Sequence, residues 1–261
     1  MIKSLNTAAT GMIAQQSNMD TIANNIANVS TNGFKKGRAE FEDLIYHNLK
    51  EPGQASGEQS VSPTGVQTGL GVRTASVQKD FTQGQVQITK NPLDINIEGP
   101  GFFQVRTPDG EIAYTRDGAF KKDASGKVVD KNGNILVPEI TVPEDALTLE
   151  ISPAGQISCV TRANEASTPI GQLDIANFIN PAGLKSMGRN LYSPTAASGQ
   201  ANTYRPGTVG TGFLSQGELE TSNVNIVDEM VNMITAQRAY ETNSKVIQTA
   251  DQMLQTAVSV K

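Results

Sequence analysis

Residues 5–29 read LNTAATGMIAQQSNMDTIANNIANV, and apolar side chains recur in this stretch every seven positions. One series is Leu5, Met12, Met19 and Ile26. A second series, three positions later, is Ala8, Gln15, Ile22 and Val29, in which Gln15 is the one polar member. Two series with this offset correspond to the a and d positions of a heptad, so the stretch predicts a helix with a coiled-coil-like seam. Ser4 is its expected N-cap, and Asn32-Gly33 is the expected left-handed stop.

The segment 222–261 repeats this pattern at the other end of the chain. Its seven-residue series is Ile226, Met233, Tyr240, Ile247 and Leu254, accompanied by Met230, Ala236, Ala250 and Ala257. Ser222 and Asn223 precede the series and are the expected cap. Asp228 and Glu229 suit the positive end of a helix dipole, so a second long helix is predicted.

The middle of the chain, about 84–215, has the pattern of a β domain. Residues 93–98 (LDINIE) alternate between apolar and polar side chains, as a half-buried strand does. Turn pairs such as Asp117-Gly118, Ser125-Gly126 and Asn132-Gly133 recur at short intervals, which is typical of hairpins.

These patterns predict an α+β fold in which two terminal coiled-coil-like helices pack together and flank an inserted antiparallel β domain. We expect residues 1–35 and 220–261 to form a helical polymerisation domain and residues 84–219 to form the β domain. Residues 36–83 are the expected extended connecting segment, since much of the stretch has the Gly, Pro, Ser and Gln content of a linker.

The composition excludes several kinds of partner. The net charge of -5 and pI of about 5.0 argue against nucleic acid, because phosphate binding needs clustered cations. Lys35, Lys36 and Arg38 form the compact basic cluster of the chain, which we expect to be solvated.

Cys159 lies in an alternating run and is expected to be a small core residue. Residues 1–30 contain no continuous apolar core of a secretory signal, so no cleaved signal is expected.

The residue types required for common catalytic and cofactor sites do not come together in this sequence. His47 is the single histidine, which rules out multi-histidine metal sites. Gly126-Lys127 is followed by Val128, so it is not a phosphate-binding loop, and no Gly-x-Ser-x-Gly element is found. We therefore predict no enzymatic activity, no metal or cofactor and no small-molecule substrate.

The N-terminal helix is poor in charge, which bears on its partner. Lys3 and Asp20 are its only charged residues up to position 30, so its outer face lacks the charges of a solvated coiled coil. The two helices can pair with each other, but one partner covers only one face. A bundle of copies covers more, and contacts that do not close generate a filament. The residues expected to carry self-assembly are Leu5, Met12, Met19, Ile22, Ile26, Val29, Ile226, Met230, Met233, Tyr240, Ile247 and Leu254.

Three stretches of the chain resemble the flagellar rod and hook proteins. The first is ANNIANVSTNGFK at 23–35, and the second is the C-terminal run SNVNIVDEM at 222–230 with QRAYE at 237–241. The third combines GPGFF at 99–103 with YTRDGAF at 114–120, and it is similar to the β domain of that family. The length of 261 residues and the GLGVR run at 69–73 resemble the distal-rod branch most.

The resemblance implies a structural subunit of the bacterial flagellar basal-body distal rod, a rigid hollow helical shaft that transmits motor torque to the hook. It also implies export without a cleaved signal by the flagellar type III apparatus, a location in the rod spanning the periplasm, and contacts with other rod and hook subunits and the surrounding bushing rings. The segment 47–72 is expected to stiffen the assembled shaft. The alternatives are another axial protein of the family and a β-domain binding module that dimerises through a coiled coil.

Overall fold

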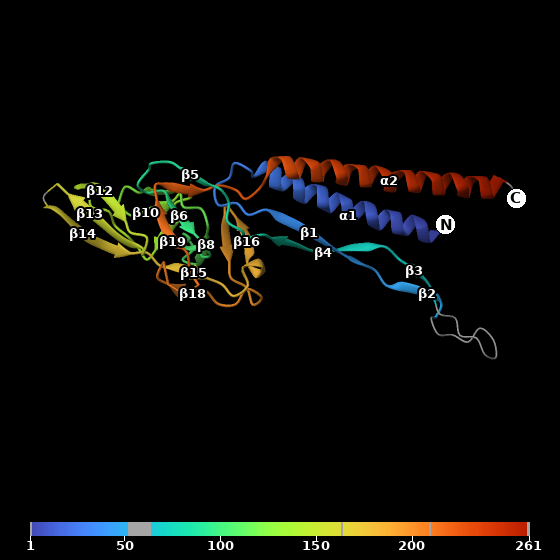
Figure 1. Cartoon of the computed structure of the whole chain (residues 1–261), viewed down its shortest axis with the longest axis horizontal. Coiled ribbons are helices and arrows are strands. Elements are labelled where there is room, and N and C mark those ends of the chain that lie inside the picture. Colours follow the sequence, from blue (N-terminus) through green and yellow to red (C-terminus); the bar gives the residue numbers. More distant parts are fainter. Residues whose placement is uncertain (1, 52–63, 163, 209, 260–261) are drawn as a thin grey trace. The chain divides into compact units, whose positions relative to one another are not determined.

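The computed structural model describes residues 2–51, 64–162, 164–208 and 210–259, and it divides the chain into two compact units (Figure 1). The helical unit comprises residues 1–27, 37–78 and 225–261. The β unit comprises residues 28–36 and 79–224. Each unit is therefore built from segments that are distant in the sequence.

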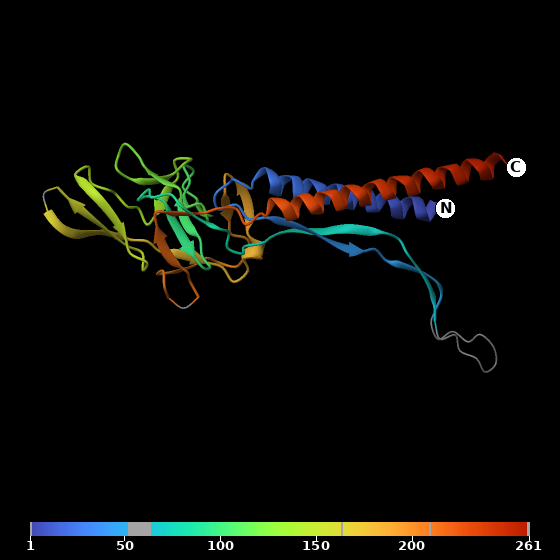
Figure 2. The same ribbon diagram turned by 45° about the horizontal axis from the view of Figure 1, so that its top comes forward.

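In the helical unit, α1 (Ile2–Ala27) and α2 (Ile226–Ser259) lie side by side and antiparallel (Figures 1 and 2). Strand β1 (Gly37–Asp43) pairs with β4 (Val72–Lys79) and contacts α1. Beyond it, β2 (Tyr46–Lys50) pairs with β3 (Val66–Gly69). Within the described residues, neither helix has the length and hydropathy that a membrane span requires.

The β unit is assembled from short antiparallel strands. Its main sheet has the order β16-β17-β8-β7-β11-β10-β9, a second sheet has the order β12-β13-β14, and β15-β18, β19-β6 and β20-β5 form pairs. The strands are β5 (Val86–Ile88), β6 (Ile95–Glu98), β7 (Phe103–Arg106), β8 (Ile112–Thr115), β9 (Phe120–Lys122), β10 (Val128–Asp130), β11 (Ile135–Val137), β12 (Ala146–Ile151), β13 (Gln156–Thr161), β14 (Asn164–Gln172), β15 (Ile175–Asn177), β16 (Lys185–Gly188), β17 (Leu191–Ser193), β18 (Asn202–Tyr204), β19 (Phe213–Gln216) and β20 (Glu218–Glu220).

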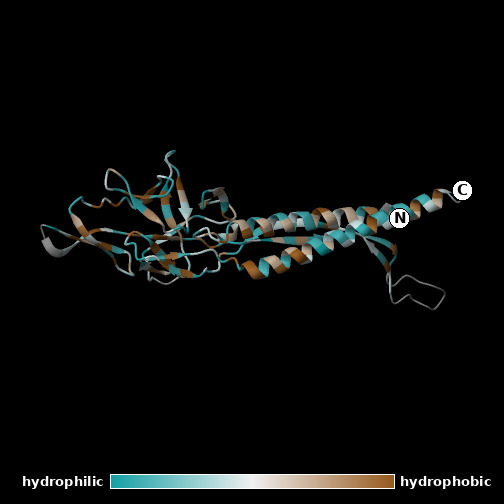
Figure 3. Ribbon diagram, turned by 90° about the horizontal axis from the view of Figure 1, so that it is seen from above, coloured by the Kyte–Doolittle hydropathy of each residue, from teal (hydrophilic) through white to brown (hydrophobic). Residues whose placement is uncertain are grey.

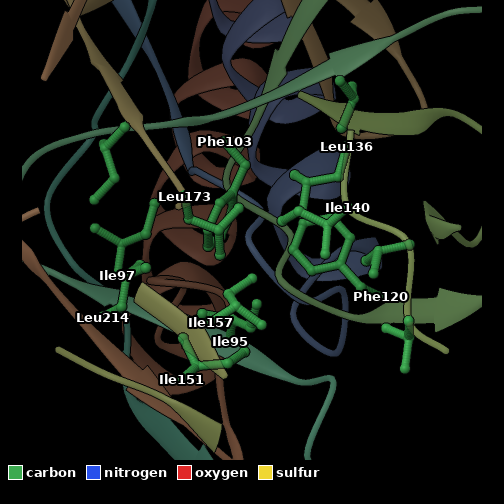
Figure 4. Packing of buried hydrophobic residues seen from close by; sticks show 14 of the residues in the cluster. Ile95, Ile97, Phe103, Phe120, Leu136, Ile140, Ile151, Ile157, Leu173 and Leu214 are labelled. Atoms are coloured by element: carbon green, nitrogen blue, oxygen red, sulfur yellow. The ribbon is translucent and has the colours of Figure 1, made fainter. Parts of the chain in front are cut away.

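Adjacent phenylalanines feed two hydrophobic cores in the β unit. Phe103 packs in the main core, where its ring meets Phe120 edge to face at 5.2 Å between centroids (Figure 4). Phe102 lies in a second cluster with Phe178 and Tyr192, because successive side chains of an extended chain point to opposite faces. The GPGFF stretch therefore supplies one anchor to each core.

The predicted fold class is confirmed, since paired terminal helices flank an inserted antiparallel β region. Cys159 is buried in β13, as expected of a small core residue. Gly33 has the expected left-handed φ of +68°, but it does not stop the helix, since α1 ends at Ala27. The predicted domain boundaries remain a prediction.

Two predicted helix caps are wrong. Ser4 lies inside α1, which extends to Ile2, because a cap preference of about 1 kcal/mol does not stop a helix that still packs on a partner. At the second helix the cap is Asn225, whose side-chain oxygen accepts the amide of Val227 at 3.1 Å. Asn223 is instead held by β-unit backbone groups, accepting the amide of Lys36 at 2.8 Å.

Residues 36–83 were predicted as an extended connection, and the strand pairings within them were not anticipated. The register Tyr46↔Gly69 to Lys50↔Val66 makes β2 and β3 the two arms of a ribbon. Residues 52–63 of the segment expected to stiffen the shaft lie outside the described residues.

Candidate assembly interface and its anchors

The seam between the helices is lined by small and polar side chains on the α2 side. The buried residues of α2, within its described length, are Glu229, Ala236 and Ala250, spaced by multiples of seven. Asn243 occupies the remaining position of this series and is partly buried. Small side chains allow the two helices to approach closely, but they bury little apolar area.

Two close contacts fix the register of the helix pair. A Cβ at Gly11 of α1 would lie 2.9 Å from the side-chain nitrogen of Asn243, so the two helices approach closely at this point. Asn25 of α1 donates to the carboxylate of Glu229 at 3.3 Å. In both contacts the two residue numbers add up to 254, as expected of an antiparallel pair in constant register.

Asn25 also joins the helix pair to the neighbouring strand. Its side chain donates to the carbonyl of Gly37 and accepts the amide of the same residue, both at 2.8 Å. With the bond to Glu229, one buried amide group connects α1, β1 and α2. A buried polar side chain that finds its hydrogen-bond partners in a single arrangement favours that arrangement over all others.

Eleven of the twelve predicted assembly residues lie on α1 and α2, whereas Val29 follows the end of α1 at Ala27. Ile22 is buried, whereas Ile226, Met230 and Tyr240 are exposed. The partly buried members are Leu5, Met12, Met19, Ile26, Val29, Met233, Ile247 and Leu254. Within one chain, most of these side chains are thus only half covered, and their role in self-assembly remains a prediction.

A buried ion cluster anchors the β unit. Lys35 and Arg116 bind the two oxygens of the Glu220 carboxylate at 2.7 and 2.6 Å. The side chains of Lys35 and Glu220 are each 1% exposed. The predicted solvated basic cluster is therefore wrong for Lys35, because its ammonium finds a carboxylate in the interior.

The cluster holds several chain segments together. Lys35 also donates to the carbonyl of Thr82, and the amide of Gly84 donates to Glu220, each at 2.7 Å. The guanidinium of Arg116 donates to the carbonyls of Ile97, Gly99 and Gly101. The chain leaves the β unit after Lys36 and again after Val224, and it returns at Lys79. The bonds of Lys35, Thr82, Gly84 and Glu220 therefore keep these three points close together.

The electrostatics of the cluster favour the ionised carboxylate. Burial raises the pKa of Glu220, but Arg116 and Lys35 outweigh burial, so the net pKa lies below its ordinary value. Burial lowers the pKa of Lys35 despite the opposing effect of Glu220. Burial, with a smaller contribution from the charge of Glu220, raises the pKa of Tyr192 to about 12.

The sequence patterns contained only part of this arrangement. Lys35 and Arg116 lie in two of the stretches that carried the family resemblance, but Glu220 lies 185 residues from Lys35. Gly11 and Asn25 are a small and a polar residue within the predicted N-terminal helix. Such residues can indicate close contact with a neighbouring element, but the heptad pattern did not predict this contact. Within the described residues, no group of acidic, histidine and cysteine side chains is arranged to hold a metal ion.

The fold and its anchors define a structural α+β protein whose two chain ends pair with each other. Family models match the chain in three places. The flagella basal body rod protein model matches residues 5–35, the flagellar hook protein FlgE/F/G D1 domain model residues 96–159, and the flagellar basal body rod FlgEFG protein C-terminal model residues 215–260.

Relatives match along nearly the whole chain. The flagellar basal-body rod protein FlgG of Buchnera aphidicola subsp. Schizaphis graminum is 50% identical over 98% of both chains. Its namesake in Borreliella burgdorferi is 49% identical, covering 100% of this chain and 99% of its own. That of Bacillus subtilis is 38% identical over 100% of both.

The chain belongs to the flagellar basal-body rod protein family. It is a structural subunit of the flagellar basal-body rod, where it resides, and the predicted resemblance to the distal-rod branch is confirmed. As a rod protein it assembles with other axial subunits of the flagellum. This identity removes the alternative of a binding module that dimerises through a coiled coil.

Replacing Glu220 by Gln tests the ion cluster. We expect the free energy of unfolding of the full chain to fall by about 3–5 kcal/mol at neutral pH, because two buried cations lose their counter-charge. The pKa of Glu220 is lowered in the folded state, so its ionised carboxylate stabilises the fold at pH values above the ordinary pKa of a glutamate. The difference in unfolding free energy between Glu220→Gln and the unaltered protein should therefore shrink as the pH falls below about 4. Urea unfolding at several pH values measures this. Glu218→Gln on the same strand is the control, and an equal loss in both variants would contradict the assignment.

Replacing Asn25 by Ala tests the link between α1, β1 and α2. The change leaves the amide of Gly37 and the carboxylate of Glu229 without this partner, so a loss of about 1–3 kcal/mol is expected. Urea unfolding followed by circular dichroism gives the value. Asn6→Ala, at an exposed position of the same helix, controls for helix propensity and is expected to change stability little. If both variants behave alike, the side chain of Asn25 does not hold the helices.

Proposed function

We propose that copies of this chain polymerise through their paired terminal helices into a rigid, hollow helical shaft that transmits motor torque to the hook. The observation that carries the proposal is the incomplete cover of the helices. Within the described residues, α2 buries no large apolar side chain completely, although apolar residues recur along its length (Figure 3). Apolar faces that a chain cannot cover alone are typical of interfaces between copies.

The further partners in this proposal follow from the place of a rod subunit in the flagellum. Other rod subunits and hook subunits would contact the two ends of the shaft, and the bushing rings would surround it. The type III export apparatus would deliver each subunit without a cleaved signal. The shaft would span the periplasm. We propose no catalysis, since the buried ionic groups of the described residues are engaged in structural contacts.

The segment 47–72 contributes stiffness in this proposal. Strands β2 and β3 form a ribbon with exposed apolar side chains, among them Tyr46, Leu49 and Val66. A neighbouring copy would cover these side chains in the rod, and the contact would restrain bending.

Placing a carboxylate in the half-covered seam tests the proposal. Met19→Asp and Ile247→Asp are expected to abolish rod assembly and swimming, because burial of an unpaired carboxylate costs several kcal/mol. The measurements are a swimming assay and electron microscopy of purified basal bodies, with urea unfolding to show that the β unit remains folded.

The matched controls are Gln16→Asp and Gln248→Asp, which place the same charge at exposed positions of α1 and α2. Normal rods built from Met19→Asp or Ile247→Asp protein would refute polymerisation through these faces.

A further inference from the structure

The helix α2 continues beyond the part that α1 can cover. The constant register of the pair places Ile2, the first described residue of α1, opposite Gln252. The described helix continues through residues 253–259, about 10 Å further, and Figures 1 and 2 show this end reaching past the start of α1. We call residues 253–259 the C-terminal overhang.

The overhang keeps the apolar pattern of the seam. Leu254 and Ala257 extend the two series that contain Ile247 and Ala250. Met253 and Val258 flank them, and Val258 is 76% exposed. These four side chains lie within about 140° of the helix circumference, on the same face as the seam. The apolar face of α2 thus continues past the end of α1, which indicates that another chain covers this part of the face.

The other end of α2 carries an uncovered apolar surface. This outer stripe consists of Ile226, Val227, Met230, Val231 and Ile234, and Val227 is 68% exposed. The stripe also covers about 140° of the helix, on the face turned away from Glu229 and Ala236. Since those two residues face α1, the partner helix leaves the stripe open.

We propose that the C-terminal overhang of one copy docks on the outer stripe of the next copy, so that α2 helices contact head to tail. The proposal rests on the proposed polymerisation and names the surfaces that carry it along the shaft. The overhang contains no charged residue, so docking on the apolar stripe removes no ionised side chain of the overhang from water. A contact between opposite ends of α2 in two copies joins different surfaces, and such a head-to-tail contact can extend into an open helical filament.

Cysteine cross-linking tests the docking. In a Cys159→Ala background, Val231→Cys and Val258→Cys are combined in one chain, and assembled basal bodies are treated with a short bismaleimide. The two positions lie about 40 Å apart on one helix, so a link between them within a single chain is impossible. The proposal expects a ladder of covalent oligomers, because each copy links to the next at both ends.

The controls separate this proposal from polymerisation itself. Each single-cysteine variant is expected to remain monomeric under denaturing conditions. Normal rods from the double variant without a ladder would overturn the docking but leave polymerisation standing. Dimers alone, or dimers from one single variant, would indicate a two-fold contact and would also overturn it. Normal rods built from Met19→Asp or Ile247→Asp protein would instead refute polymerisation through the seam.

A second measurement applies if the cysteine variants assemble poorly. Val258→Asp is compared with Thr256→Asp, an exposed position of the same turn that points away from the apolar face. We expect about a tenfold fall in assembled rods for Val258→Asp and little change for Thr256→Asp. Equal numbers of rods from the two variants would overturn the docking.

Discussion

The contact seam between α1 and α2 determines which side chains of the helical unit are buried and which remain uncovered. Its α2 side places Glu229, Ala236, Asn243 and Ala250 against α1, so the helices come close but gain little from apolar burial. The larger apolar side chains of α2 are then directed partly or wholly outward. A helix pair built in this way is specific in register and incomplete in cover, which suits a subunit that is completed by other copies.

Buried polar contacts supply the precision that the weak seam lacks. Asn25 fixes α1, β1 and α2 to one another through three hydrogen bonds. In the β unit, Glu220 binds Lys35 and Arg116, and so it holds together the two places, after Lys36 and after Val224, where the chain leaves this unit. Such groups stabilise a single arrangement strongly, because any alternative leaves a charge or an amide buried without a partner.

The sequence predicted those features that depend on local periodicity. The heptads located both helices, and alternation with turn residues located the β domain, since each pattern reflects one element meeting one apolar surface. Contacts between distant segments left no such pattern. Lys35 was predicted to be solvated because nothing near it in the chain reveals Glu220, and Asn225 was passed over for an equally plausible cap two residues earlier. Glu229 was read as a favourable helix start, whereas its position facing Asn25 depends on the register of the pair.

The central claim is that the helix faces left open within one chain are covered by other copies in the rod. Methionine oxidation by hydrogen peroxide tests it directly, since Met230 in the outer stripe and Met253 in the overhang are 53% and 54% exposed, and Met187 of the β unit is 51% exposed. In the free chain Met230, Met253 and Met187 are expected to oxidise at similar rates, so Met187 serves as the reference outside the helices. In purified rods, mass spectrometry is expected to show oxidation of Met230 and Met253 slowed about tenfold or more relative to the free chain. Oxidation of both residues in rods as fast as in the free chain would contradict the account.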